Sequence, residues 1–440
     1  MSGSHAHVQA DRDPTIMKSL GFLEKVFSTS PFKAFRVKLW DGTVWQPGKS
    51  PPRFTLELKH PGALRRMFWS PNELSLGEAY IYGDFDIHGD IESCFKLSEY
   101  LLERSWRIRE KARLARDLLT LPGKRPSESC SRAARLSGAR HSKKRDAEAI
   151  SHHYNISNDF YRLWLDENMV YSCAYFQTAE DDLDEAQLRK LDYLCRKLRL
   201  KPGERLLDIG CGWGGLIMYA TRNYGVEALG ITLSQNQADF ANAQIRAAGL
   251  AERCEARVLD YRDVDESTPF HKLVSVGMFE HVGETQLLPY FKKALRLLKS
   301  GGVFLNHGIT ESMQRQPKQG PSFIDKYVFP DGELMPVTTS LRVAEEAGFE
   351  IRDVESLREH YALTLRHWVE RLQRNRDKAI EMTSDATYRI WNIYMAGSAY
   401  GFESGEMNLH QTLMIRAEDG ISPLPLTRCD WYRPSGEGQT

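Results

Sequence analysis

Residues 205–306 alternate between short apolar runs and amphipathic helical patterns, and this alternation constrains the fold more than any other feature of the chain. Such a rhythm is typical of strand–helix–strand units, in which consecutive strands lie parallel and helices cover both faces of the sheet. The expected strands are 205–209, 227–233, 256–260, 273–278, 303–306 and 411–416, and the clearest helices are 234–248 and 287–298. The sequence therefore predicts an α/β fold with a doubly wound, mostly parallel sheet.

The first of these strands runs straight into a glycine-rich turn. Leu206-Leu207-Asp208-Ile209 is followed by Gly210-Cys211-Gly212-Trp213-Gly214-Gly215 and then by a helical pattern. Glycines let the backbone turn tightly and approach a ligand, which in such sheets binds beyond the carboxyl ends of the strands. The spacing differs from the G-x-G-x-x-G of dinucleotide-binding proteins, and an acid precedes the first glycine. An acid beside the loop suits a cationic amino-acid ligand better than a pyrophosphate.

This loop resembles that of class I S-adenosylmethionine-dependent methyltransferases, whose catalytic domain is a seven-stranded Rossmann-like sheet. The resemblance implies that Asp208 and the loop glycines hold the methionine moiety and that Asp260, after the third strand, lies by the adenine. The second strand of that family normally ends in an acid for the ribose hydroxyls. This chain instead has Gly230-Ile231-Thr232-Leu233-Ser234 with Gln237 further on, and the departure indicates a narrower subfamily.

Six segments, in the same order along the chain, resemble the cyclopropane-fatty-acyl-phospholipid synthase family, including its mycolic acid relatives. They are residues 152–161, 169–176, 230–237, 260–263, 277–283 and 323–332. In this family a Thr-Leu-Ser-x-x-Gln stretch replaces the usual acid of the second strand. The resemblance implies a cofactor site made of Tyr171, Ser172, Asp208, Gly210, Gly212, Gly214, Gly215, Thr232, Leu233, Gln237, Tyr261 and Arg262.

The same resemblance implies transfer of a methylene carbon from S-adenosylmethionine across a cis double bond of an unsaturated phospholipid acyl chain. The alkene attacks the sulfonium methyl group, and the resulting carbocation loses a proton from that group to close a cyclopropane ring. The family uses bound bicarbonate as the base, and its pocket corresponds here to Cys173, Glu280, His307, Tyr361 and the backbone of Ile309. In this arrangement His307 and Tyr361 can donate to the anion, while Glu280 can accept its hydroxyl and orient His307.

These side chains also have purely structural interpretations. A single cysteine is commonly a small core residue, and Tyr171 and Tyr361 could be ordinary buried aromatics. Agreement with the family motifs favours the catalytic interpretation. The family frequently has a cysteine in the helix where this chain has Ser398, so a mechanism that needs that thiol is excluded.

Other functions remain open at this point. A hydride shift in the carbocation would give a methyl- or methylene-branched chain, and the shape of the pocket would decide between the products. A small-molecule N- or O-methyltransferase would share the fold but need no bicarbonate pocket. A lipid-binding protein that has lost catalysis is disfavoured by the intact glycine loop and pocket residues.

The length of 440 residues predicts two or three domains. We expect a disordered lead at 1–18, a small α+β domain at 19–100, a basic helix and linker at 101–145, a catalytic domain at 146–420 and a tail at 421–440. Within the small domain, alternating apolar residues at 35–39 and 54–58 predict strands and a hairpin, and 74–101 should be helical.

Charge is unevenly distributed although the totals cancel, with 59 Lys and Arg against 59 Asp and Glu. The totals therefore do not support a nucleic-acid partner. Residues 101–145 hold 14 basic residues and 4 acids, a net +10. This segment is either a solvated linker or a surface that docks on an anionic phospholipid bilayer.

The seven cysteines are scattered without a Cys-x-x-Cys pair, which disfavours a disulfide framework and a zinc site. The first residues lack an apolar signal segment, and no stretch is long enough to cross a bilayer. We therefore expect no metal and a cytoplasmic protein that contacts the inner face of the membrane peripherally, and a homodimer remains open.

Overall fold

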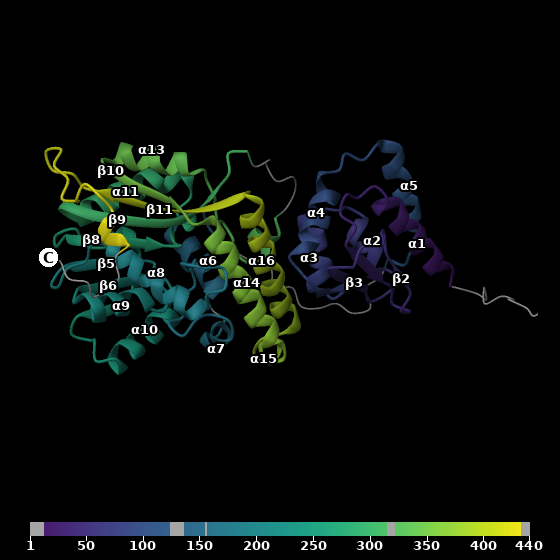
Figure 1. Cartoon of the computed structure of the whole chain (residues 1–440), viewed down its shortest axis with the longest axis horizontal. Helices are drawn as coiled ribbons and strands as arrows, with labels where there is room; N and C mark the ends of the chain where they lie inside the picture. Colours follow the sequence, from purple (N-terminus) through teal and green to yellow (C-terminus); the bar gives the residue numbers. More distant parts are fainter. Residues whose placement is uncertain (1–12, 124–135, 155, 315–321, 433–440) are drawn as a thin grey trace, which may run out of the picture. The chain divides into compact units, whose positions relative to one another are not determined.

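The structure, a computed structural model, describes residues 13–123, 136–154, 156–314 and 322–432 (Figure 1). The chain divides into two compact units. The first comprises Met1–Arg132, Lys318–Lys326 and Ser384–Tyr400, and the second comprises Ala133–Pro317, Tyr327–Thr383 and Gly401–Thr440. Two short segments from late in the chain therefore join the N-terminal unit, which the continuous boundaries expected from the sequence did not include.

The first unit contains a four-stranded sheet in the order β2-β1-β3-β4. Its strands are β1 (Phe35–Lys38), β2 (Val44–Trp45), β3 (Phe54–Leu58) and β4 (Phe85–Gly89), and its helices include α1 (Pro14–Phe27), α2 (Ala63–Phe68), α3 (Glu73–Ile81), α4 (Ser93–Glu103) and α5 (Ile108–Leu119). The strands expected at 35–39 and 54–58 are β1 and β3, but these two pair parallel and do not form a hairpin with each other. A hairpin is present between β1 and β2, which pair antiparallel across the turn at Gly42.

Two expectations for this unit were wrong. Residues 74–101 are not one helical region, because α3 ends before Gly83, whose φ of +74° is left-handed, and β4 then pairs with β3. Residues 14–18 are not disordered, because α1 begins at Pro14 and the carboxylate of Asp13 accepts from the amide of Thr15 at 2.8 Å. An Asp–Pro start is a recognised N-cap signal. Residues 1–12 lie outside the described residues.

The second unit contains the predicted seven-stranded sheet, in the order β10-β11-β9-β8-β5-β6-β7. Its strands are β5 (Arg205–Ile209), β6 (Glu227–Thr232), β7 (Cys254–Val258), β8 (Phe270–Val276), β9 (Leu298–Glu311), β10 (Glu350–Ser356) and β11 (Met407–Ile415). Only β11 runs antiparallel to its neighbours β9 and β10. The doubly wound, mostly parallel α/β fold is therefore confirmed. β10, a half-exposed edge strand, is the one strand that the apolar pattern did not predict.

Helices cover both faces of this sheet, with α8, α9 and α10 on one face and α11 and α13 on the other (Figure 1). Their bounds are α8 Leu183–Leu198, α9 Gly215–Tyr224, α10 Gln235–Ala247, α11 Leu287–Leu297 and α13 Val337–Ala347. The other helices of this unit are α6 Lys143–Tyr154, α7 Asn158–Arg162, α14 Arg358–Arg374 and α15 Arg376–Met382, whereas most of α12 (Phe323–Tyr327) and α16 (Asp385–Ser404) belongs to the first unit. Alternate strand residues enter the two cores, Leu206 and Leu305 on the first face and Leu207 and Phe304 on the second.

Two expected segments are only partly described. Residues 124–135 of the basic linker lie outside the described residues, and the linker's last residues open α6. In the expected tail, Trp431 is 3% exposed and belongs to the first core. Among the helices that the structure describes, none is both long enough and apolar enough to cross a bilayer.

Candidate active site

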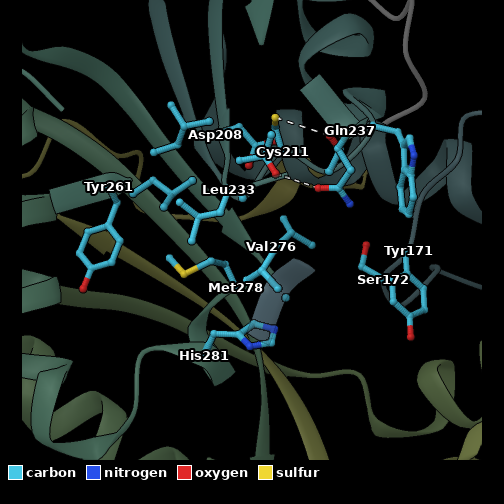
Figure 2. Close-up of a pocket in the computed structure, with 18 of the residues that line it drawn as sticks. Tyr171, Ser172, Asp208, Cys211, Leu233, Gln237, Tyr261, Val276, Met278 and His281 are labelled. Carbon is cyan, nitrogen blue, oxygen red and sulfur yellow. Dashed lines mark hydrogen bonds between the residues drawn. The ribbon is translucent and has the colours of Figure 1, made fainter. Parts of the chain in front are cut away.

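A pocket opens at the carboxyl ends of β5, β6 and β8, where the strand order reverses direction. This is the place at which doubly wound sheets bind ligands. Eleven of the twelve residues expected around a cofactor line it: Tyr171, Ser172, Asp208, Gly210, Gly212, Gly215, Thr232, Leu233, Gln237, Tyr261 and Arg262. Figure 2 shows Tyr261 and Ser172 on opposite sides of the space, with Asp208 and Cys211 between them along one edge.

The glycine loop owes its shape to three left-handed residues, Gly210, Gly212 and Gly214, with φ of +96°, +53° and +87°. A Cβ on Gly212 would meet no atom within 4 Å, so this residue faces open space in the pocket. A Cβ on Gly214 would lie 2.9 Å from the Cβ of Ala241. Gly214, the expected residue that does not line the pocket, therefore permits the close packing of α9 on α10.

Asp208 is 2% exposed, and its Oδ1 has no hydrogen-bond partner among the described residues. Burial raises the pKa of its carboxyl group to about 7, against a lowering effect from the positive charge of Lys190. A buried carboxylate without a partner is costly unless a ligand supplies one. The position therefore suits a cationic group of the ligand.

Lys190, on α8, is a pocket residue that the sequence analysis missed. It is 1% exposed, and its ammonium donates to the hydroxyl of Ser172 at 2.8 Å. Because that oxygen accepts from Lys190, Ser172 can direct its own proton into the pocket. Burial lowers the pKa of Lys190 to about 8. The available signal was a lysine on the apolar stripe of α8, in line with Ala186 and Leu194.

The turn after β6 supplies polar groups that hold each other. The hydroxyl of Thr232 donates to Oε1 of Gln237 at 2.8 Å, and Ser234 caps α10 by accepting from the amide of Gln237. Both Thr232 and Gln237 are buried. The Thr-Leu-Ser-x-x-Gln stretch thus forms a rigid wall where an acid stands in other methyltransferases.

Arg262, after β7, ties the pocket to α6. Its guanidinium donates to Asp260 at 2.6 Å and to Asp146 at 3.0 Å. Burial acts to raise the pKa of Asp260, but the hydrogen bonds from Arg262 outweigh it and hold that pKa below its usual value. Asp146, with Ala149 and Ile150, also lines the pocket; the sequence analysis did not anticipate this contribution of α6.

The residues expected to hold a base lie beside this pocket but do not line it. Glu280 is 8% exposed in a 3₁₀ turn, between the lining residues Met278 and His281. Its Oε1 accepts from the backbone amide of Ile309 at 2.6 Å, while Oε2 has no partner in the described part of the chain. Burial raises the pKa of Glu280 to about 7.

His307, on β9, is 1% exposed and contacts Gln411 of β11, whose amide nitrogen lies 3.1 Å from Nδ1. Its Nε2 has no hydrogen-bond partner among the residues described. Burial, and after it the positive charges of Lys190 and Lys197, keep the pKa of His307 well below 6.5. The expectation that Glu280 orients His307 was wrong. The strand register sets Gln411 opposite His307, and Glu280 binds Ile309 instead.

Cys173 and Tyr361 come together at Leu357. The thiol of Cys173 is fully buried and lies 3.9 Å from the carbonyl of Leu357, which also accepts from the amide of Tyr361. Burial raises the pKa of Cys173, which therefore stays a thiol. The backbone amide of Leu357 donates to the carbonyl of Leu409. Leu409 in turn lies opposite Ile309, where β11 pairs with β9. The strand pairing thus brings all five expected residues to one region.

Comparison with known proteins bears directly on this arrangement. The family model described as mycolic acid cyclopropane synthetase matches residues 141–412, and a model for a domain of unknown function matches residues 22–105. A probable fatty acid methyltransferase of Pseudomonas putida is 43% identical over 402 residues, covering 90% of this chain and 96% of that protein. A probable fatty acid methyltransferase of Mycobacterium tuberculosis is 36% identical over 427 residues, covering 94% and 99%.

Solved structures give the same result. The chain resembles a crystal structure of mycolic acid cyclopropane synthase CmaA1 complexed with SAH and CTAB, with a TM-score of 0.58 and 34% identity. The match covers 61% of this chain and 98% of that one.

Proposed function

The chain belongs to the mycolic acid cyclopropane synthetase family of S-adenosylmethionine-dependent, lipid-modifying methyltransferases, and we propose that it forms a cyclopropane ring on an unsaturated phospholipid acyl chain. The observation that carries this proposal is the pair of buried polar atoms, Glu280 Oε2 and His307 Nε2, that lack partners among the described residues beside the cofactor pocket. A methyltransferase for nitrogen or oxygen acceptors can also use a carboxylate or an imidazole as its base, but it has no need of bicarbonate bound between them.

The polar groups of the pocket support one orientation of S-adenosylmethionine. The buried carboxylate of Asp208 suits the α-ammonium group, while the Lys190 ammonium and the Ser172 hydroxyl suit the α-carboxylate. Asp260 and Tyr261, after β7, line the wall assigned to the adenine. This orientation uses every buried charge that the pocket presents.

Bicarbonate fits the chemistry of the donor set beside that pocket. His307 is neutral and carries one ring N–H, the Glu280 carboxyl can accept or donate near neutral pH, and the Cys173 thiol is a weak donor. When bound, bicarbonate supplies the base that takes up the methyl proton. The protein's part is to hold that base in a dry region and to offer the carbocation no thiolate, since burial keeps Cys173 protonated.

The decisive test is product analysis. The purified protein is incubated with methyl-labelled S-adenosylmethionine and vesicles of a phospholipid with a cis-monounsaturated chain, and the released acyl chains are analysed by mass spectrometry and proton NMR. Label in a cyclopropane ring is the expected result. Label in a methyl branch or an exocyclic methylene would support the branched product instead, and lipids without label would refute the proposal.

The described part of the basic segment supports a proposal for the membrane contact. Helix α5 packs Leu118 into the first unit and exposes Arg109, Arg113 and Arg116. Ile108 is 86% exposed on the same helix. A basic face with exposed apolar side chains suits the surface of an anionic bilayer, to which each arginine contributes on the order of 1 kcal/mol. We propose that α5 docks the enzyme peripherally on the cytoplasmic face of the membrane.

Vesicle sedimentation tests this surface. Replacing Arg109, Arg113 and Arg116 with Gln should weaken binding to phosphatidylglycerol vesicles at low salt, and unchanged binding would refute the role of α5. The matched control changes three exposed arginines of the catalytic unit, Arg222, Arg246 and Arg253, to Gln. Binding of the unmodified protein should also fall as salt rises, because exposed charges are screened beyond roughly 8 Å at 0.15 M.

A further inference from the structure

A chain of three buried side chains runs from helix α8 to the candidate catalytic histidine. The ammonium of Lys197 donates to Oε1 of Gln411 at 2.8 Å, and Nε2 of Gln411 lies 3.1 Å from Nδ1 of His307. All three residues are 1% exposed. Lys197 comes from the helical layer, Gln411 from the antiparallel strand β11 and His307 from β9, so only the folded sheet assembles them.

The chemistry of these groups leaves a single arrangement of hydrogens. An ammonium can only donate, so the Gln411 atom that faces Lys197 is the carbonyl oxygen. The amide nitrogen then faces His307, and because an amide nitrogen only donates, Nδ1 of His307 must be the acceptor. A neutral imidazole that accepts at Nδ1 carries its hydrogen on Nε2.

The ammonium at the start of this chain keeps its charge through other contacts. Glu355 forms an ion pair with Lys197, and the ring centroids of Tyr193 and Trp431 lie 4.7 and 5.3 Å from Nζ. Burial lowers the pKa of Lys197, and the ion pair with Glu355 opposes that effect and favours the ammonium form that donates to Gln411.

We propose that Lys197 and Gln411 are positioning residues that hold His307 as the Nε2–H tautomer, so that His307 is a fixed hydrogen-bond donor toward the reacting groups and not the base. The proposal rests on the proposed function only in placing His307 at the reaction site. It explains an asymmetry of the ring. Gln411, itself held by Lys197, satisfies Nδ1, whereas Nε2 has no partner among the described residues, and a network that served packing alone would leave neither end unsatisfied.

Heteronuclear NMR reads the tautomer without any assay of activity. In protein labelled with ¹⁵N-histidine, two-bond proton–nitrogen correlations distinguish Nδ1–H, Nε2–H and imidazolium rings, and a His307→Asn variant assigns the signal. The expected result is a neutral Nε2–H ring at pH 7. A neutral Nδ1–H ring or an imidazolium in the unmodified protein would overturn the proposal, whatever the variants do.

Two variants test the hydrogen-bond network of Lys197, Gln411 and His307. Gln411→Glu places an acceptor opposite Nδ1, so the ring should change to the Nδ1–H tautomer, and turnover should fall on the order of 10²-fold while the affinity for S-adenosylmethionine stays within about twofold. Lys197→Met should yield a mixture of tautomers, because the side-chain amide of Gln411 is then free to rotate by half a turn and present either its oxygen or its nitrogen to His307. The control is Lys272→Met, which removes another buried lysine, paired with Glu204 near the amino-terminal ends of β8 and β5, and should leave the tautomer unchanged.

The outcomes separate this inference from the proposed function. If Gln411→Glu switches the tautomer and turnover is unchanged, His307 is not a donor in the reaction and the positioning role is refuted, although cyclopropane product could still form. If the tautomer does not respond to either variant, Lys197 and Gln411 do not control the tautomer of His307 and the proposal is refuted. If Gln411→Glu does not fold, the unmodified protein and Lys197→Met still decide the question.

Discussion

The buried carboxylate of Asp208 should make the binding of S-adenosylmethionine strongly dependent on pH. Its pKa in the free protein is about 7 because burial penalises the charged form. A ligand whose α-ammonium pairs with this carboxylate stabilises the ionised form, so binding expels the proton. The affinity for S-adenosylmethionine should therefore rise as the pH rises toward and through 7.

The size of the effect follows from the ionised fraction. With a pKa of about 7, roughly a tenth of the molecules hold Asp208 ionised at pH 6 and roughly three quarters at pH 7.5. The apparent dissociation constant scales inversely with the competent fraction, so it should be about eightfold weaker at pH 6 than at pH 7.5. Lys190, with a pKa of about 8, is charged in only about three quarters of the molecules at pH 7.5, which reduces this ratio to about sixfold. Measurements should stop there, because more of that charge is lost above pH 7.5.

Isothermal titration calorimetry in two buffers with different ionisation enthalpies measures both quantities. We expect release of about 0.9 proton per ligand bound at pH 6 and almost no net release at pH 7.5, where proton uptake by Lys190 offsets the loss from Asp208. Asp208→Asn should bind weakly and without this pH slope, whereas Asp239→Asn, which alters an exposed acid on α10, should keep it. A dissociation constant that does not change between pH 6 and 7.5 in the unmodified protein would refute the pairing of Asp208 with the ligand cation.

Three further changes separate the parts of the site. Gly212→Val should abolish cofactor binding in calorimetry with the fold retained, because its side chain would project into pocket space that is free of protein atoms; undiminished affinity in a folded variant would contradict the loop assignment. Lys190→Met should raise KM for S-adenosylmethionine roughly 10- to 100-fold, as expected for the loss of a charged hydrogen bond, with kcat little changed at saturation; an unchanged KM would remove Lys190 from the cofactor site. Glu280→Gln should lower turnover on the order of 10²-fold with cofactor affinity unchanged, and added bicarbonate should partly restore it. Equal turnover of the unmodified enzyme with and without bicarbonate would point to Glu280 itself as the base.

The sequence determined those features that depend on neighbours along the chain. The apolar strands, the helices between them and the glycine loop after β5 each occupy a few consecutive residues, and their periodicity or backbone requirement is visible locally. The pocket residues that follow β6 and β7 were predicted from the resemblance to the family, and they meet because the carboxyl ends of parallel strands lie at one edge of a sheet. The half-exposed β10 and the short β4 were not, since neither strand has a strong apolar pattern.

The tertiary structure alone decided which side chains hold the candidate catalytic groups. Gln411 faces His307 because of the register between β9 and β11, and 104 residues separate the two in the sequence. A slip of one residue in that register would turn the opposite side chain to the other face of the sheet. Lys190 and Lys197 read as ordinary charged helix residues until α8 is packed against the sheet, where burial removes their water and limits their partners to a few groups. Local sequence sets backbone conformation, but a buried hydrogen-bond network exists only once distant elements have excluded solvent from it.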